Sequence, residues 1–132
     1  MTDTTPAGQW LTLPDVAELL GTDISKVRGM LHDRVIVAVR RGENPVKRVP
    51  ADFFVPRHLE NPADRREPVE GERPVPLPSL RGTIALLGDL RFDDDEIVDW
   101  LLTDNDEIGT TPLAALREGR RSQVRRVAQS LL

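Results

Sequence analysis

The pattern of apolar and polar positions predicts a short helix near the N-terminus. Over Leu13–Leu20 apolar side chains recur at helical spacing, and Thr12 before them is suited to be the N-cap. Pro14 lies in the first turn, where a missing backbone N–H has no cost. Gly21 follows the last apolar position, and a residue that readily takes positive φ commonly ends a helix.

A second helix is predicted from Ile24 to about Arg34, with Thr22 or Asp23 as its N-cap. Its apolar positions repeat at helical spacing and would face a core. The opposite, outward face consists of Ser25, Lys26, Arg28, Gly29 and His32.

The two segments together meet the spacing of a helix-turn-helix. Two helices that cross steeply over a tight turn need small or apolar residues at fixed positions. Those positions are filled by Leu13, Ala17, Gly21, Val27 and Met30. A generic helical hairpin is the alternative interpretation of this segment alone.

The residues after the second helix predict a β-hairpin. The run 35–39 is suited to a strand, residues 41–45 are rich in turn formers, and 46–49 can return as a second strand. A short helix can start over 50–54. A hairpin at this position is the wing of a winged helix, whose second helix enters the DNA major groove while the wing touches phosphate or minor groove.

Prolines divide the chain. Six of the eleven prolines lie between Pro56 and Pro78, in a segment with few large apolar residues. Because proline lacks a backbone donor and restricts its neighbour, this segment is predicted to be a linker. Helices are predicted after it over residues 79–90, 93–102, 111–119 and 120–132.

These elements predict a mainly helical fold with a small β-hairpin wing. The expected organisation is a flexible tail over 1–9, a winged helix-turn-helix over 10–55, a proline-rich linker over 56–78 and a helical C-terminal domain over 79–132. The C-terminal helices either contact a second copy or partner, or pack back onto the first domain as one body.

Charge is distributed unevenly, which changes the meaning of the net charge of −4. Residues 24–48 carry a local charge of +5, residues 89–107 carry −8, and residues 117–126 carry +4. The acidic segment includes 93–96, at a helix start where acids stabilise the helix dipole. Because a local patch keeps its own field, the basic segment fits a nucleic-acid partner. Solvated helix faces are the alternative explanation.

The chain offers little for catalysis or metal binding. It has no cysteine, and His32 and His58 lack a second ligand at metal spacing. The loop 104–109 matches a calcium loop only in part, because Ile108 and Ala115 occupy two ligand positions. No phosphate-binding loop or nucleophile motif is present. We expect no cofactor, no metal and no enzymatic activity.

The composition is that of a soluble globular chain, with 39% hydrophobic and 30% charged residues. No apolar run has the length of a membrane span, and the N-terminus lacks the basic start and apolar centre of a signal peptide. We therefore expect a cytoplasmic protein without a membrane partner.

A resemblance to known families covers nearly all of the chain from Trp10 onward. The winged helix-turn-helix of MerR-type and excisionase-type proteins is similar to the stretches LTLPDVAELLGTDISKVRGMLHDR and VAVRRGENPVKRVPADFF. The whole chain resembles a small actinobacterial family of winged-helix DNA-binding proteins with a proline-rich linker and a helical C-terminal domain. The resemblance implies binding to double-stranded DNA through the second helix and the wing. The residues expected to contact DNA are Ser25, Lys26, Arg28, His32, Arg40, Arg41, Lys47 and Arg48.

Gly29 departs from this pattern. Glycine inside a helix costs about 1 kcal/mol relative to alanine. Either it permits close approach to a phosphate, or the helix is only marginally formed before DNA binds.

The leading hypothesis is a sequence-preferring DNA-binding protein that regulates transcription. The alternative is a protein-interaction adaptor or antitoxin-like module whose C-terminal helices bind a partner protein. The stretch TPLAALREGRRSQVRRVAQSL is similar to the C-terminal domain of antitoxins that pair with certain ADP-ribosylating toxins. That similarity implies a homodimer or a protein partner through residues 79–132.

The N-terminal tail is a candidate site of regulation. Thr2, Thr4 and Thr5 precede the first apolar anchor, Trp10, so we expect their hydroxyls to be accessible to a Ser/Thr kinase. A phosphate adds nearly two negative charges and would repel DNA from a module of modest positive excess. An inert, disordered start is the other interpretation.

Overall fold

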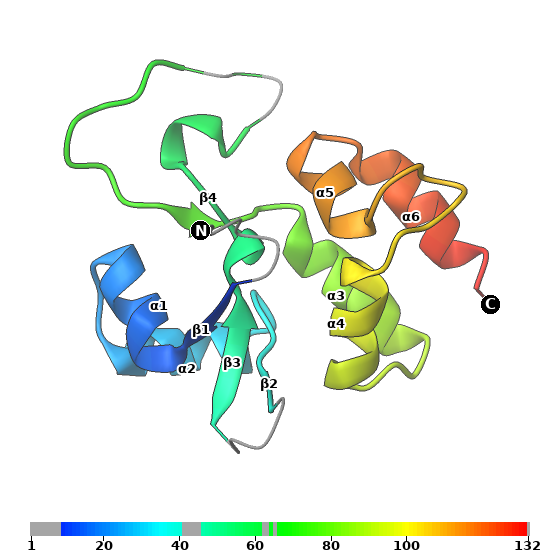
Figure 1. Cartoon of the computed structure of the whole chain (residues 1–132), viewed down its shortest axis with the longest axis horizontal. Coiled ribbons are helices and arrows are strands. Elements are labelled where there is room, and N and C mark those ends of the chain that lie inside the picture. The colour runs from blue at the N-terminus through cyan, green and yellow to red at the C-terminus, as the bar shows by residue number, and fades with distance from the viewer. Residues whose placement is uncertain (1–8, 41–45, 62–63, 65, 132) are drawn as a thin grey trace.

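The arrangement of helices and strands comes from a computed structural model that describes residues 9–40, 46–61, 64 and 66–131. Figure 1 shows a small antiparallel sheet with α1 and α2 on one side and α3 to α6 on the other. The fold is mainly helical with a small hairpin wing, as the sequence predicts.

The first helix, α1 (Leu13–Leu20), begins and ends as predicted. Thr12 Oγ1 accepts a hydrogen bond from the Asp15 backbone N–H at 3.3 Å, and Asp15 Oδ2 accepts one from the Thr12 N–H at 3.1 Å. This reciprocal pair satisfies two backbone donors at the helix start. Gly21, with φ of 69°, ends the helix in the left-handed conformation.

The second helix, α2 (Ile24–His32), is shorter than predicted because it ends before Arg34. Its N-cap is Asp23 rather than Thr22, and Asp23 Oδ1 accepts a hydrogen bond from the Lys26 N–H at 2.9 Å. Arg34 has φ of 62°, which is uncommon for a residue with a side chain. The helix cannot continue through this conformation, so the chain turns there toward the sheet.

The predicted wing is present as an antiparallel hairpin of β2 (Val39–Arg40) and β3 (Lys47–Pro50). The prediction of a strand over 35–39 is wrong in extent, because only Val39 belongs to β2. Residues 36–38 are buried, so their apolar side chains fill the core instead of extending a hydrogen-bond ladder.

A third strand, β1 (Trp10–Thr12), was not predicted. It pairs with the other side of β3, with Leu11 opposite Val49, and gives the sheet order β1-β3-β2. A strand of three residues is too short to show a period in the sequence. Because β1 pairs with β3, the wing hairpin is part of a three-stranded sheet that packs against α1.

Short elements occupy the region that follows the wing. A single 3₁₀ turn, η2 (Ala51–Phe53), takes the place of the helix expected over 50–54. Two strands that were not predicted, β4 (Phe54–Val55) and β5 (Val75–Pro76), pair antiparallel, and β5 lies within the predicted linker. A second 3₁₀ turn, η3 (Arg57–Leu59), follows β4.

The predicted C-terminal helices are present, each slightly shorter than expected. Asp93 caps the second of them by accepting a hydrogen bond from the Glu96 N–H at 2.8 Å, and Gly119, with φ of 89°, follows the third. In the described ranges, no helix is long and apolar enough to cross a membrane. The C-terminal helices are α3 (Leu80–Asp89), α4 (Asp94–Leu102), α5 (Pro112–Arg117) and α6 (Arg121–Gln129).

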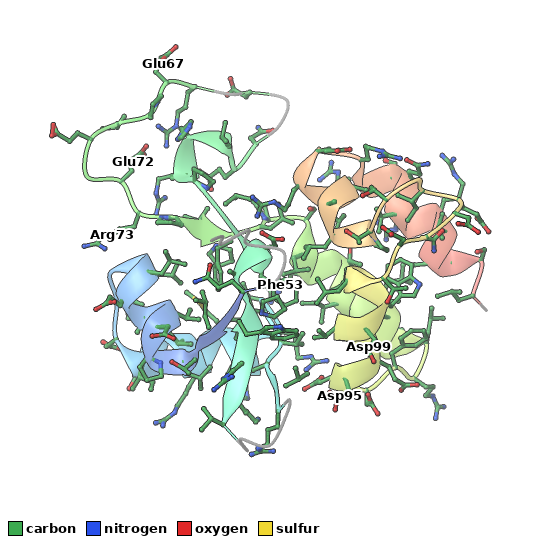
Figure 2. The ribbon with its side chains drawn as sticks, in the orientation of Figure 1. Phe53, Glu67, Glu72, Arg73, Asp95 and Asp99 are labelled. Atoms are coloured by element: carbon green, nitrogen blue, oxygen red, sulfur yellow. The ribbon has the colours of Figure 1, made fainter. Side chains whose placement is uncertain are left out.

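One hydrophobic core joins the two halves of the chain. Val27 of α2, Phe53 of η2 and Leu80 of α3 are fully buried members of the same cluster. Figure 2 shows Phe53 between the sheet and the C-terminal helices. The C-terminal helices thus pack back onto the first half, which is one of the two arrangements that the sequence left open.

Arg117 on α5 reinforces this packing with hydrogen bonds. Its Nη1 donates to the carbonyl oxygens of Asp52 at 2.9 Å and of Phe54 at 2.7 Å. The Asp52 carbonyl belongs to η2, directly after β3, and the Phe54 carbonyl belongs to β4, so α5 holds the chain that follows the wing in place.

Candidate nucleic-acid interface

The solvent face of α2 carries the contact residues predicted for that helix. Val27 on the opposite face is fully buried, and α2 packs there against α1. The His32 side chain is 89% exposed, with Nδ1 3.3 Å from Asp33 Oδ1. The exposed predicted residues are Ser25, Lys26, Arg28 and His32.

Gly29 lies on the same exposed face. A Cβ built on Gly29 would meet nothing within 4 Å among the described residues, so internal packing does not require a glycine there. The position therefore lowers helix stability without a compensating internal contact. It leaves the helix backbone open to close approach by a ligand.

The wing presents two like charges to solvent. Arg40 on β2 and Lys47 on β3 are directly opposed and both exposed. Like charges at opposed positions of an antiparallel pair repel each other, so an external anion would stabilise this arrangement. Arg48, the next wing cation, is half-buried opposite Val39.

The predicted contact residues that the structure describes thus lie on two elements, α2 and the β2–β3 wing. In Figure 1 both elements lie in the lower part of the view, away from α6. Arg41 lies outside the described residues, as do the tail threonines Thr2, Thr4 and Thr5.

Arg34, which contributes to the positive charge of residues 24–48, is engaged elsewhere. Its Nη1 donates to Asp94 Oδ1 at 2.9 Å, and the two side chains are 43% and 45% exposed. Asp94 belongs to the first turn of α4, so this ion pair joins the end of α2 to the C-terminal helices. Sequence analysis missed the contact, because it assigned the acids of 93–96 to the dipole of their own helix.

The start of α4 and the wing share a groove of about 510 Å³. Arg40 and Lys47 contribute cations to its lining, and Asp93 to Asp95 contribute carboxylates. α4 also packs directly against β2. The acidic end of the C-terminal half is therefore a neighbour of the basic wing.

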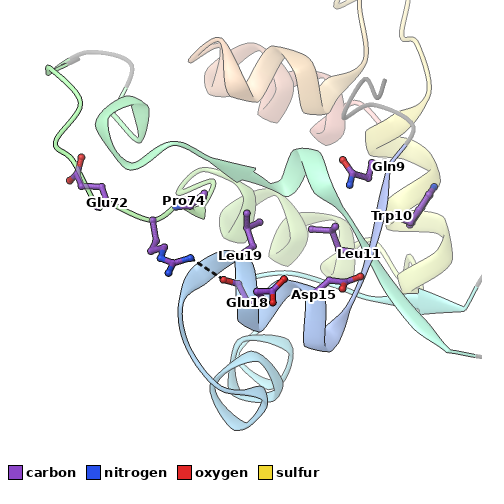
Figure 3. Close-up of a pocket in the computed structure, with 10 residues that line it drawn as sticks. Gln9, Trp10, Leu11, Asp15, Glu18, Leu19, Glu72 and Pro74 are labelled. Atoms are coloured by element: carbon purple, nitrogen blue, oxygen red, sulfur yellow. Dashed lines mark hydrogen bonds between the residues drawn. The ribbon is translucent and has the colours of Figure 1, made fainter. Parts of the chain in front are cut away.

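A larger groove of about 810 Å³ lies between α1 and residues 71–74 (Figure 3). Arg73 Nη1 donates there to the Glu18 carbonyl at 3.3 Å, at the C-terminal end of α1, where a cation is favourable. A Cβ on Gly21 would lie 3.1 Å from Arg73 Nε. The loop thus supports the turn between α1 and α2.

Two carboxyl groups with shifted pKa values, Asp52 and Glu72, lie outside the groove that the wing shares with α4. Burial raises the pKa of Asp52 above its ordinary value of 3.8, and the charge of Arg117 opposes the shift. The hydrogen bond from Arg66 lowers the pKa of Glu72, on the loop shown in Figure 2. Over the described part of the chain, no group of three His, Cys, Asp or Glu side chains could hold a metal ion.

The fold and these exposed cations define the class of protein. Two helices joined by a tight turn at Gly21 are followed directly by an antiparallel hairpin. This arrangement is a winged helix-turn-helix, with α2 in the position of the recognition helix.

Comparison with known proteins identifies the family. Residues 2–54 match the family described as "DNA-binding protein Rv2175c, wHTH domain", and residues 77–131 match "Rv2175c C-terminal domain of unknown function". The chain is 34% identical over 112 residues to the DNA-binding protein Rv2175c of Mycobacterium tuberculosis. The chain belongs to this family, which confirms the resemblance to a small winged-helix family.

A solved structure agrees with this assignment. The NMR structure of Rv2175c matches with a TM-score of 0.71 at 29% identity, over 98% of this chain and 86% of that chain. The sequence match covers 85% of this chain but only 61% of the M. tuberculosis protein. The two therefore share a fold over nearly all of this chain, while the relative is longer.

Proposed function

We propose that the protein binds double-stranded DNA and regulates transcription, with α2 in the major groove and the wing on the phosphate backbone. The observation that carries the proposal is the set of exposed cations on two elements, Lys26 and Arg28 on α2 and Arg40 opposite Lys47 on the wing. The name of the M. tuberculosis relative, a DNA-binding protein, supports the same partner.

The residues have different roles in this proposal. In helix-turn-helix proteins, the first turns of the second helix reach base edges, so Ser25, Lys26 and Arg28 are the candidates for base contacts. Wing cations neutralise phosphates and hold the domain in register without reading sequence. Because one winged helix contacts only a few base pairs, the proposal includes a second copy on each binding site.

Competition gel shifts test the proposal. The full chain is mixed with a pool of genomic fragments, the bound fragments are selected, and their binding is measured against excess non-specific duplex over a series of salt concentrations. We expect selected fragments to form complexes that persist under competition and contain two chains. Binding that is lost at moderate salt for every sequence would contradict a sequence-preferring regulator.

A further inference from the structure

We infer that the acidic start of α4, defined as Asp93, Asp94 and Asp95, competes with DNA for the cations of the wing and so suppresses binding to non-specific duplex. The inference rests on the proposed DNA-binding function. It assigns the C-terminal helices a part in selectivity, in addition to their packing.

α4 lies directly against the wing. α4 packs against β2 of the wing, and the Arg34–Asp94 hydrogen bond of 2.9 Å joins the start of α4 to the end of α2. Arg40 and Lys47 line the same groove as the three aspartates. Arg34 and Asp94 are 60 positions apart in sequence, and Arg40 and Lys47 are also distant in sequence from the aspartates, so the folded chain itself brings the two charge signs together.

The charge at the start of α4 remains negative in spite of the helix dipole. Asp93 and Glu96 form a capping box, with hydrogen bonds of 2.8 and 3.0 Å to each other's backbone N–H. The N-terminus of a helix carries roughly half a positive charge, whereas Asp93 to Glu96 are four consecutive acids. The helix therefore presents a negative end to the groove.

Screening is weak across so small a space. A groove of about 510 Å³ keeps its walls within about one Debye length, roughly 10 Å at 0.1 M salt. The aspartates therefore lower the positive potential at Arg40 and Lys47, and they repel a phosphate that approaches those side chains.

Non-specific complexes are affected more than specific ones. Binding to an arbitrary duplex depends almost entirely on phosphate contacts, whereas a specific complex also gains base contacts from the recognition helix. Weakening the wing therefore removes a larger share of the non-specific affinity. The acidic start of α4 therefore raises the ratio of specific to non-specific DNA affinity.

The test uses the full chain with Asp93→Asn and Asp95→Asn combined. Asparagine remains a good N-cap, and Asp94 is kept so that its ion pair with Arg34 is unchanged. The control combines Asp104→Asn with Asp106→Asn, exposed positions beyond the opposite end of α4 that change net charge equally. Asp95→Asn alone, which leaves the capping box intact, repeats the test with a smaller change. Thermal unfolding verifies that each variant is folded.

Fluorescence anisotropy with a labelled random-sequence duplex over a salt series gives the readout. We expect the Asp93/Asp95 variant to bind about three- to tenfold more tightly at low salt, with a steeper salt dependence, and the control to match the wild type. Equal changes in both variants would show an effect of net charge alone and overturn the inference, as would unchanged or weaker binding in the Asp93/Asp95 variant. Folded wild-type protein that binds no duplex at low salt would instead overturn the DNA-binding proposal itself.

Discussion

Arg28 is the side chain on which sequence preference would depend most directly. It is exposed on α2, and an arginine paired with a guanine contributes about 1–3 kcal/mol of discrimination. We expect Arg28→Ala to weaken binding to a selected duplex by that amount in competition gel shifts. Arg81→Ala, at an exposed position on α3, is the matched control and should bind like the wild type. Equal affinity of Arg28→Ala and wild-type protein would contradict the assignment.

Asp52 gives a residue-scale prediction about pH. Because burial raises its pKa in the folded state, the folded protein binds a proton more readily than the unfolded chain above pH 3.8. Wild-type stability therefore falls relative to Asp52→Asn as the pH rises through the raised pKa. Well below pH 3.8, Asp52 is protonated in both the folded and the unfolded chain and is neutral like asparagine, so the free energies of unfolding of the wild type and Asp52→Asn converge. Urea unfolding at several pH values measures the difference, and a wild type that gains stability over Asp52→Asn with rising pH would refute this account.

The sequence predicted the orientation of some basic side chains and not of others. Lys26 and Arg28 are exposed as helical periodicity predicts, because one buried neighbour, Val27, fixes the orientation of the helix. Arg34 could not be assigned in this way, since its orientation follows from a left-handed turn and a partner in α4. Local pattern decides which face a residue occupies, whereas long-range packing decides its partner.

At the scale of the element, two glycines have opposite roles, Gly21 directly after α1 and Gly29 within α2. A methyl group on Gly29 meets open space in a helical conformation, so Gly29→Ala should raise the free energy of unfolding by about 1 kcal/mol. Gly21 has φ of 69° and lies against Arg73, so Gly21→Ala should lower it, by roughly 1 kcal/mol or more. Chemical denaturation of both variants provides the comparison. Shifts of the same sign would contradict the helix boundaries described for α1 and α2.

Elements with caps were predicted well, and short strands were not. Thr12, Asp93 and Thr111 each accept the backbone hydrogen bond of an N-cap, and each stands before a helix that the sequence predicts. β1, β4 and β5 have two or three residues each and depend on partners elsewhere in the chain. Their pairing is a tertiary event, which local propensity does not record.

At the scale of the whole molecule, the shared core makes the wing depend on the C-terminal helices. A chain that ends at Pro78 loses the C-terminal helices that share the core with Phe53, and it loses the hydrogen bonds from Arg117 to the carbonyls of Asp52 and Phe54. We expect this truncated chain to lose cooperative unfolding in circular dichroism, whereas the full chain keeps it. A truncated chain that unfolds cooperatively would contradict the shared core and favour two independent domains.

The central claim is that α2 and the wing form the DNA-binding surface. NMR titration of the labelled full chain with a selected duplex tests it directly, because each backbone amide reports its own environment. The account predicts that shift changes concentrate on Ile24–His32 and on β2 and β3, while α6, which lies away from them in Figure 1, stays unchanged. Changes concentrated on α5 and α6, or no changes at all, would contradict it.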